Sequence, residues 1–266
     1  MSKKVVIVTG ASSGIGKALS LEYINKEYNV VLAARNLEKL QNVVKDLPTT
    51  NYLLVQTDVT QDDQCQALMN TTIEKFGRLD VLINNAGISM RALFKDLQVD
   101  VLKQVMEVNF WGMVYCTKAA MPHLLASKGT VVGISSIAGY RGLPGRTGYS
   151  ASKFAMNGFL EALRTENLKT GVNVLTASPG FTASAIREKA LSADGSNQGE
   201  SPRDEGKMMT AEEVAQHIFK AVEKRKRTLI LTRQGKLTVF LNKWMPGKLD
   251  NMVFNHMAKE DDSPFK

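Results

Sequence analysis

Short apolar runs rich in β-branched residues alternate with helix-like segments along most of this 266-residue chain. The apolar runs are predicted strands, at residues 5–8, 30–33, 52–55, 81–83, 130–134, 172–176 and 228–231. The segments between them are predicted helices, at residues 15–26, 37–46, 61–76, 99–127, 149–169 and 211–224. Most runs are continuously hydrophobic, which is typical of strands buried on both faces. The alternation predicts an α/β fold with one doubly wound parallel sheet of about seven strands, flanked by helices.

The composition is that of a soluble globular chain, with 44% hydrophobic and 23% charged residues. The first apolar run is too short for a signal peptide or a membrane span, so we expect a cytoplasmic protein. Cys65 and Cys116 lack metal-ligand spacing, and we expect reduced thiols and no metal site. Much of the +8 formal charge lies late in the chain, including a basic run at residues 224–227. No nucleic-acid-binding motif accompanies that charge, so we expect no nucleic-acid partner.

A glycine-rich stretch follows the first predicted strand and opens the first predicted helix. Its candidate nucleotide-binding residues are Gly10, Ser12, Ser13, Gly14, Ile15 and Gly16. Glycines allow a sharp turn and the close approach of a ligand, and the first N–H groups of the helix point at an anion. The stretch therefore predicts a phosphate cradle, although an ordinary strand–turn–helix connection has a similar pattern. Its spacing, G-x-x-x-G-x-G, differs from the commoner G-x-G-x-x-G.

Residues just after each strand are informative because ligands of such folds bind beyond the carboxyl ends of the strands. Arg35 and Asn36 follow the second run, where NAD-binding folds usually carry an acid for the ribose hydroxyls. The Arg35 guanidinium suits a 2′-phosphate, which favours NADP(H) over NAD(H); a plain surface arginine is the alternative. Asp58 and Val59 follow the third run, as an adenine contact or a helix N-cap. The fourth run is followed by a turn that either admits a cofactor or stabilises the sheet, formed by Asn84, Asn85, Ala86 and Gly87.

The side chains best suited to acid–base chemistry follow the fifth run. Ser135 and Ser136 come directly after it, and Tyr149 and Lys153 begin the next predicted helix. Because Tyr149 and Lys153 are four residues apart, they share one face of a helix. A lysine ammonium, together with a positive nicotinamide ring, would bring the tyrosine pKa towards the working range. The pattern Tyr-x-x-x-Lys alone is common in helices. It indicates a catalytic site only because the phosphate cradle, Ser135 and Ser136 precede it in the same chain.

These motifs together resemble the classical short-chain dehydrogenase/reductases, a family with a single-domain Rossmann-type fold, over about residues 3–226. The glycine stretch matches the family's cofactor motif, and residues 84–87 match its sheet-stabilising motif. The catalytic tetrad is expected at Asn109, Ser136, Tyr149 and Lys153, with Ser136 at the usual 13 residues before Tyr149. One departure is Ser13, where many NADP(H)-preferring members carry a basic residue. The segment that closes over the nicotinamide is matched by Pro179, Gly180, Phe181 and Thr182.

The resemblance implies an oxidoreductase that transfers a hydride between NADP(H) and a small-molecule carbonyl or secondary alcohol. Tyr149 would be the general acid/base, Ser136 would position the substrate oxygen, and Lys153 would bind the nicotinamide ribose and tune Tyr149. Asn109 would hold a water in a proton relay, and satisfying a bent helix is an alternative compatible with that role. By analogy with the family, the two long helices predicted at residues 99–127 and 149–169 build the interface of a homodimer or homotetramer. Two other functions remain open: a 3-oxoacyl-carrier-protein reductase and, less favoured, a non-catalytic NADP(H)-sensing regulator.

The chain divides into a dinucleotide-binding and catalytic domain at residues 1–233 and a C-terminal helical extension at residues 234–266. The extension carries two apolar stripes at helical spacing, separated by Pro246 and Gly247. With their flanking lysines, these stripes resemble an interfacial amphipathic helix, which points to a peripheral membrane contact. A helical pair that packs over the substrate pocket or against a dimer partner is the favoured alternative.

Substrate-facing residues are expected within residues 89–96, 138–147 and 183–209. The last of these segments is polar and is predicted to be a mobile lid that orders on binding. A partly apolar pocket is expected from Met90, Ile137, Tyr140, Leu143 and Phe181. Arg91, Arg141 and Arg146 could meet an anionic part of the substrate, although arginines near a pocket are more often only solvated.

Overall fold

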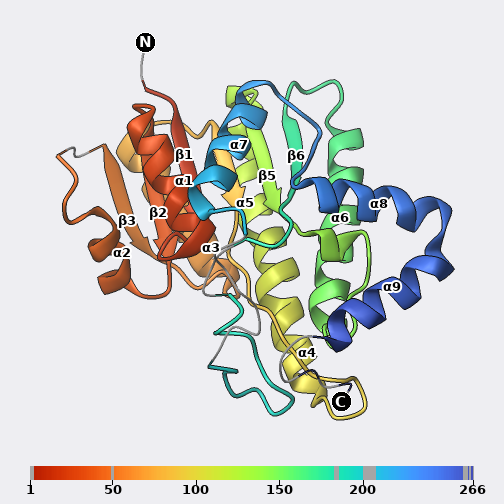
Figure 1. Cartoon of the computed structure of the whole chain (residues 1–266). Coiled ribbons are helices and arrows are strands. Elements are labelled where there is room, and N and C mark those ends of the chain that lie inside the picture. Colours follow the sequence, from red (N-terminus) through yellow and green to blue (C-terminus); the bar gives the residue numbers. More distant parts are fainter. Residues whose placement is uncertain are drawn as a thin grey trace.

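The computed structural model of the chain describes residues 3–48, 51–182, 186–199, 208–259, 263 and 265. Its centre is a parallel sheet of seven strands in the order β3-β2-β1-β4-β5-β6-β7 (Figure 1). The strands are β1 Val5–Thr9, β2 Asn29–Ala34, β3 Tyr52–Gln56, β4 Val81–Asn84, β5 Thr130–Ile134, β6 Asn173–Ser178 and β7 Thr228–Ile230. The predicted α/β fold with a doubly wound parallel sheet is therefore confirmed.

The order of the strands places a ligand crevice beside β1. Strand β1 pairs with β2 on one side and with β4 on the other, so that Val6 lies opposite both Val30 and Val81. From β1 the chain builds outwards to β3, then crosses back to β4 and builds outwards to β7. This reversal makes the carboxyl ends of β1 and β4 a topological switch point, where open α/β sheets bind their ligands.

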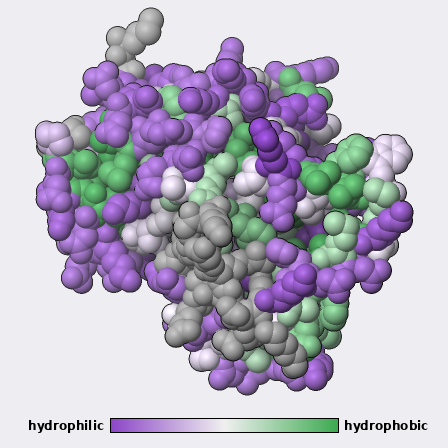
Figure 2. All heavy atoms as spheres, viewed as in Figure 1, coloured by the Kyte–Doolittle hydropathy of each residue, from purple (hydrophilic) through white to green (hydrophobic). Residues whose placement is uncertain are grey.

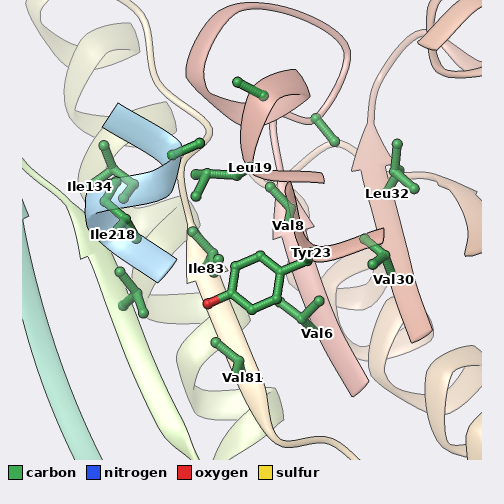
Figure 3. Close-up of a cluster of buried hydrophobic side chains, with 14 of the residues drawn as sticks. Val6, Val8, Leu19, Tyr23, Val30, Leu32, Val81, Ile83, Ile134 and Ile218 are labelled. Carbon is green, nitrogen blue, oxygen red and sulfur yellow. The ribbon is translucent and has the colours of Figure 1, made fainter. Parts of the chain in front are cut away.

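Helices cover both faces of the sheet because successive strand residues point to opposite sides. Val6 and Val8 pack with Leu19 and Tyr23 on one face (Figure 3). Val5 and Ile7 belong to the buried cluster on the other face. The first face carries α1 (Gly14–Asn25), α2 (Leu37–Val44) and α7 (Ala211–Glu223); the second carries α3 (Asp62–Phe76), α5 (Gly112–Ser127) and α6 (Thr147–Glu166).

The prediction of one continuous helix over residues 99–127 is wrong, because a π-helical turn interrupts it. The structure has α4 at Val99–Met106, a π-helical turn at Glu107–Trp111, and then α5. A π-turn inserts extra backbone into a helix and is found most often at functional sites. Here it contains Asn109, whose side chain is only 1% exposed.

The C-terminal extension forms two helices, α8 at Arg233–Trp244 and α9 at Pro246–Ala258, seen in blue in Figure 1. Pro246 is the first residue of α9, a position where its missing N–H is not needed. Both helices are tied to the segment after β5. Arg141 forms an ion pair with Asp250, and Asn242 Nδ2 donates to the Tyr140 carbonyl oxygen at 2.9 Å. The extension therefore packs against the body of the domain.

The thiols of Cys65 and Cys116 are buried between α3 and α5, as reduced residues, with their Sγ atoms 3.4 Å apart. The expectation of reduced cysteines agrees with this placement. None of the helices in the described part of the chain has the length and apolar character needed to cross a membrane.

Candidate active site

Two glycines shape the turn after β1. Gly10 has a φ of +65°, in the left-handed region that favours glycine. A Cβ atom at Gly16 would lie 2.2 Å from the Gly10 carbonyl oxygen, which is far inside van der Waals contact. The absence of a side chain therefore lets α1 begin directly against the turn, with its first backbone N–H groups at the crevice.

The N-terminus of α1 is suited to an anion. Its N-cap residue Ser13 makes no side-chain capping bond, and the first turn holds no acidic residue. By contrast, Thr210 caps α7 through reciprocal hydrogen bonds with Glu213. Uncapped N–H groups and the positive end of the helix dipole both favour a bound phosphate.

The loop after β4 braces this cradle. Asn85 Nδ2 donates to the Thr9 carbonyl oxygen at 2.9 Å and to that of Gly10 at 3.3 Å. In return, Thr9 Oγ1 accepts the backbone N–H groups of Asn85 and Ala86, both at 3.0 Å. The turn at residues 84–87 thus joins β4 to β1, and residues 85–87 also line the crevice.

The crevice is a cavity of about 360 Å³. The predicted cofactor-binding residues that line it are Gly10, Ser12, Ser13, Gly14, Ile15, Arg35, Asn36, Asp58, Val59, Asn85, Ala86 and Gly87. Gly16 packs behind the turn and does not line the cavity. The N-cap alternative for Asp58 is wrong, because Gln61 occupies the N-cap position of α3, without a side-chain capping bond, while Asp58 Oδ1 accepts from the N–H of Thr60 at 3.0 Å.

Two lysines line the same cavity and were not predicted from the sequence. Lys39 lies in α2, four residues after Arg35, and Lys189 comes from the segment after β6. The spacing of Arg35 and Lys39 at a helix start was a usable signal. Nothing in the sequence pattern places Lys189 beside Arg35, because the two are far apart along the chain.

A second cavity, of about 440 Å³, adjoins the first and shares Ile15, Asn85, Gly87 and Ile186 with it. Ser136, Tyr149 and Lys153 all line it, together with Pro179, Gly180 and Thr182. Ser136 lies close enough to the Tyr149 hydroxyl to lower its pKa, and its Oγ accepts the Ala138 N–H at 3.1 Å. Lys153 Nζ lies 5.7 Å from the centroid of the Tyr149 ring and donates to the Ile134 carbonyl oxygen at 2.9 Å.

Burial dominates the electrostatics of this group. It raises the pKa of Tyr149, whereas Ser136 and the charges of Arg146 and Arg187 lower it. Burial also lowers the pKa of Lys153 to about 7, so its ammonium is only partly charged at neutral pH. The expectation that Lys153, together with a nicotinamide ring, brings the Tyr149 pKa towards the working range stays a prediction.

Asn109 lines neither cavity and acts on the site through Ile88 and Ser152. Its Oδ1 accepts the Ile88 N–H at 2.8 Å, and its Nδ2 donates to the Ile88 carbonyl oxygen at 3.0 Å. Nδ2 also donates to Ser152 Oγ at 2.9 Å. Both amide hydrogens are engaged, and one acceptor position on Oδ1 remains beside Gly87.

Helices α8 and α9 form an apolar wall of the second cavity, as one of the alternatives for the extension expects. Their apolar lining residues are Leu237, Leu241, Leu249, Met252, Val253 and Met257. His256 of α9 also lines the cavity, and its ring lies 6.5 Å from that of Phe181. The apolar stripes indicated a packing surface, but sequence spacing alone does not say what it covers.

The other predicted substrate contacts divide into two groups. Ile137, Leu143, Phe181 and Arg146 line the second cavity, as does Ser89 from the segment at residues 89–96. Met90 is instead fully buried in a core cluster beside α4, while Tyr140, Arg91 and Arg141 do not line the cavity. Arg141 is engaged by α8 and α9, where its Nη1 donates to Asn242 Oδ1 at 3.2 Å.

The predicted lid at residues 183–209 is described only in part. Residues 183–185 and 200–207 lie outside the described residues. Within residues 186–199, Leu191 bridges to Met90 and to Asn197. Ile186 and Arg187 reach the second cavity. Across the described ranges, no group of three or more His, Cys, Asp or Glu side chains could hold a metal ion.

This combination of fold and site matches a known family. The family model for short chain dehydrogenases matches residues 4–195, which is most of the chain. The chain belongs to the short-chain dehydrogenase/reductase family. That assignment makes it an oxidoreductase acting on CH–OH groups and implies a nicotinamide cofactor.

Particular relatives extend the match beyond the family model. The chain is 35% identical over 267 residues to dehydrogenase/reductase SDR family member 7B of Mus musculus, covering 97% of this chain and 83% of the mouse protein. It is 39% identical over 197 residues to 11-beta-hydroxysteroid dehydrogenase 1A of Arabidopsis thaliana, covering 72% of this chain and 56% of the plant protein.

Solved structures show the same fold. A short chain dehydrogenase/reductase from Burkholderia phymatum in complex with NAD aligns with a TM-score of 0.82 at 24% identity, over 91% of this chain and 93% of that one. An alcohol dehydrogenase from Thermococcus sibiricus complexed with 5-hydroxy-NADP aligns with a TM-score of 0.76 at 23% identity, over 86% and 96%.

Proposed function

We propose that this chain is an NADP(H)-dependent oxidoreductase that interconverts a carbonyl and a secondary alcohol, with Tyr149 as general acid/base. The observation that carries the proposal is the meeting of Ser136, Tyr149 and Lys153 in one cavity that adjoins the phosphate cradle. A screen of NADPH oxidation against ketones, 3-oxoacyl thioesters, steroids and sugar carbonyls tests it. Absence of turnover across the whole panel would count against the proposal.

A nicotinamide cofactor held in this crevice would supply the hydride in reduction and take it up in oxidation. Tyr149 then donates a proton to the carbonyl oxygen in reduction, or accepts it from the alcohol in oxidation. Ser136, which lines the same cavity as Tyr149, orients the same oxygen. Lys153 Nζ donates to the Ile134 carbonyl oxygen at 2.9 Å and lines the cavity, and it would bind the nicotinamide ribose of the cofactor.

Asn109 and the wall formed by α8 and α9 support this arrangement. Asn109 fixes the backbone of Ile88 beside the site, and its remaining acceptor position can take a relay water. The apolar wall from α8 and α9 covers one side of the cavity that holds Tyr149, and such a surface lowers the local dielectric and strengthens electrostatic interactions nearby.

The preference for NADP(H) rests on cations at the start of α2. Arg35 and Lys39 line the crevice beside the phosphate cradle. Asn36 caps α2 by accepting the Lys39 N–H at 2.8 Å. A 2′-phosphate placed there would meet two cations and a helix N-terminus. Asp58 also lines this cavity, but it follows β3 and not β2, where NAD-binding folds carry the acid for the ribose hydroxyls. Its Oδ1 accepts from Thr60 Oγ1.

The double substitution Arg35→Gln/Lys39→Gln is expected to lower kcat/KM for NADPH about a hundredfold, because two charge-assisted contacts to the phosphate are lost. The value for NADH should change only a few-fold. Lys45→Gln, an exposed lysine at the end of α2 and outside the cavity, is the matched control. Equal efficiency of NADH and NADPH in the unmodified chain would overturn the preference.

We also propose a peripheral contact between the outer face of α8 and an anionic membrane surface. Phe240 and Trp244 of α8 are 61% and 66% exposed, and hydrophobic atoms gather on the α8 side of the molecule (Figure 2). Lys236 and Lys243 lie on the same helix. Apolar side chains flanked by lysines suit the boundary between headgroups and acyl chains.

Co-sedimentation with vesicles containing phosphatidylserine tests the membrane contact. The unmodified chain should sediment with them, and Phe240→Ser/Trp244→Ser should stay largely in the supernatant. Leu168→Ser, which removes an apolar side chain that is 74% exposed beyond the end of α6, should leave binding unchanged. Equal sedimentation of all three proteins would refute a contact through α8.

A further inference from the structure

Lys189 brings a positive charge to the cofactor crevice from a segment that is remote in the sequence. It lines the crevice together with Arg35 and Lys39. Arg35 and Lys39 follow β2, whereas Lys189 follows β6. These two strands lie on opposite sides of β1 in the sheet, and the glycine turn stands at the carboxyl end of β1. Lys189 therefore reaches the crevice from the side opposite Arg35 and Lys39.

Lys189 also lies close to the junction of the two cavities. Residues 186–189 form one turn, and Ile186 of this turn lines both cavities. Under the proposed function, the second cavity is the substrate cavity and holds the nicotinamide end of the cofactor. The diphosphate of a dinucleotide joins its nicotinamide and adenosine halves. A cation between the junction and the 2′-phosphate site is therefore placed for the diphosphate.

The glycine turn itself offers no side-chain charge to a diphosphate. Residues 10–16 contain no Lys, Arg or His, and the N–H groups at a helix N-terminus carry only partial charges. A lysine ammonium is a compact charge with three rotatable donors, which suits the several oxygens of a diphosphate. Lys189 thus supplies the full charge that the turn lacks.

The segment that carries Lys189 is tied to the substrate cavity at both ends. Arg187, which lines this cavity, donates through Nη2 to the Thr182 carbonyl oxygen at 2.7 Å. The Leu191 N–H donates to the carbonyl oxygen of Ser89, another lining residue, at 2.9 Å. A contact that restrains Lys189 therefore also restrains part of the wall of the substrate cavity.

We propose that Lys189 binds the diphosphate of the cofactor, and that this contact fixes residues 186–191 as a wall shared by the crevice and the substrate cavity. The inference rests on the proposed function and adds a residue that couples its two cavities. Arg35 and Lys39 select the 2′-phosphate, whereas Lys189 binds the part that NADP(H) and NAD(H) have in common. Because binding free energies are reciprocal, a cofactor that fixes this wall favours the substrate, and the substrate favours the cofactor.

Two fragments of the cofactor separate the two phosphate positions without turnover. Adenosine 2′-monophosphate carries the 2′-phosphate alone, and ADP-ribose carries the diphosphate alone. In calorimetric titrations, Lys189→Gln should weaken ADP-ribose binding about fivefold, because one charge-assisted contact is lost, and should leave adenosine 2′-monophosphate binding unchanged. Arg35→Gln/Lys39→Gln should show the reverse pattern.

Matched variants control for charge and position. Lys189→Arg keeps the positive charge and should retain most of the affinity for ADP-ribose. Lys95→Gln removes an exposed lysine that lines neither cavity and should bind both fragments as the unmodified chain does. Lys189 is itself exposed, so its substitution should leave the fold intact.

Amide hydrogen exchange tests whether the contact fixes the segment. The Ala190 N–H donates to the Arg187 carbonyl oxygen at 3.1 Å, and the Leu191 N–H donates to Ser89. Saturating NADPH should slow exchange of these two amides in the unmodified chain and much less in Lys189→Gln. The amides of residues 14–16 in the cradle should gain protection in both proteins, which shows that the cofactor is bound.

The outcomes separate this inference from the proposed function. Binding of ADP-ribose that depends on Lys189, in a chain that turns over no carbonyl substrate, would overturn the proposed function alone. The inference is overturned if ADP-ribose does not bind, if Lys189→Gln binds it as tightly as the unmodified chain, or if NADPH protects residues 190 and 191 equally in both proteins. These three results leave the oxidoreductase assignment in place.

Discussion

Replacing Tyr149 by phenylalanine is expected to lower kcat about a thousandfold while leaving NADPH binding unchanged. The ring stays in place, so packing in the cavity is preserved, but the hydroxyl beside Ser136 is lost. Among the described residues that line this cavity with Ser136 and Lys153, Tyr149 is the one tyrosine. The proton transfer that accompanies hydride transfer then depends on water alone.

The matched control for this variant is Tyr140→Phe. Tyr140 lies just after Ile137–Gly139 and does not line the second cavity, which holds Tyr149. Its turnover should stay within about twofold of the unmodified chain, as expected for a site outside the machinery. NADPH affinity is followed by nicotinamide fluorescence in both variants. Substantial turnover by Tyr149→Phe would remove Tyr149 from the mechanism.

Gly16→Ala is expected to damage both the fold and the cradle. The added Cβ would lie 2.2 Å from the Gly10 carbonyl oxygen and 2.5 Å from Asn85 Nδ2, so the turn and its brace must move. We expect the free energy of unfolding to fall by about 2–3 kcal/mol, as for overpacked sites. NADPH affinity should fall more than about tenfold, because the displaced atoms position the phosphate-binding backbone.

A second glycine within a helix supplies the control. Gly158 of α6 has no atom within 4 Å of an added Cβ. Gly158→Ala should therefore raise the free energy of unfolding by about 0.5–1 kcal/mol, through helix propensity alone. Urea unfolding followed by tryptophan fluorescence measures both variants. A Gly16→Ala chain as stable as the unmodified protein would contradict the close packing of the turn.

The sheet was predictable because its strands are buried on both faces and therefore read as continuous apolar runs, such as Val5–Thr9. The cradle was predictable because its residues follow one another along the chain. The same holds for Tyr149 and Lys153, whose spacing puts them on one helical face. Local patterns of this kind survive folding because short-range geometry determines them.

Features that depend on distant parts of the chain were not predictable in this way. The π-turn around Asn109 reflects hydrogen bonds to Ile88 and Ser152, which no helix pattern displays. Lys189 reaches the cradle, and Arg187 the substrate cavity, from a segment that the sequence marked only as a lid. The tail pattern indicated packing, but only the fold shows that α8 and α9 wall the cavity.

The pKa of Tyr149 shows the same division. Sequence spacing predicts an effect of Lys153 together with a nicotinamide ring. The folded chain adds burial, which raises this pKa, and Ser136, Arg146 and Arg187, which lower it. Burial also lowers the pKa of Lys153 to about 7, which reduces the charge that this lysine offers near neutral pH. Desolvation is a property of the folded cavity, so residue spacing does not report it.

The most direct test of the central claim follows the hydride itself. NADPH carrying deuterium at the transferable ring position is incubated with the chain and the best ketone from the screen, and the alcohol is analysed by mass spectrometry. Our account predicts one deuterium at the carbinol carbon with the unmodified protein and almost no labelled product with Tyr149→Phe. Alcohol formed without deuterium, or labelled equally well by Tyr149→Phe, would contradict it.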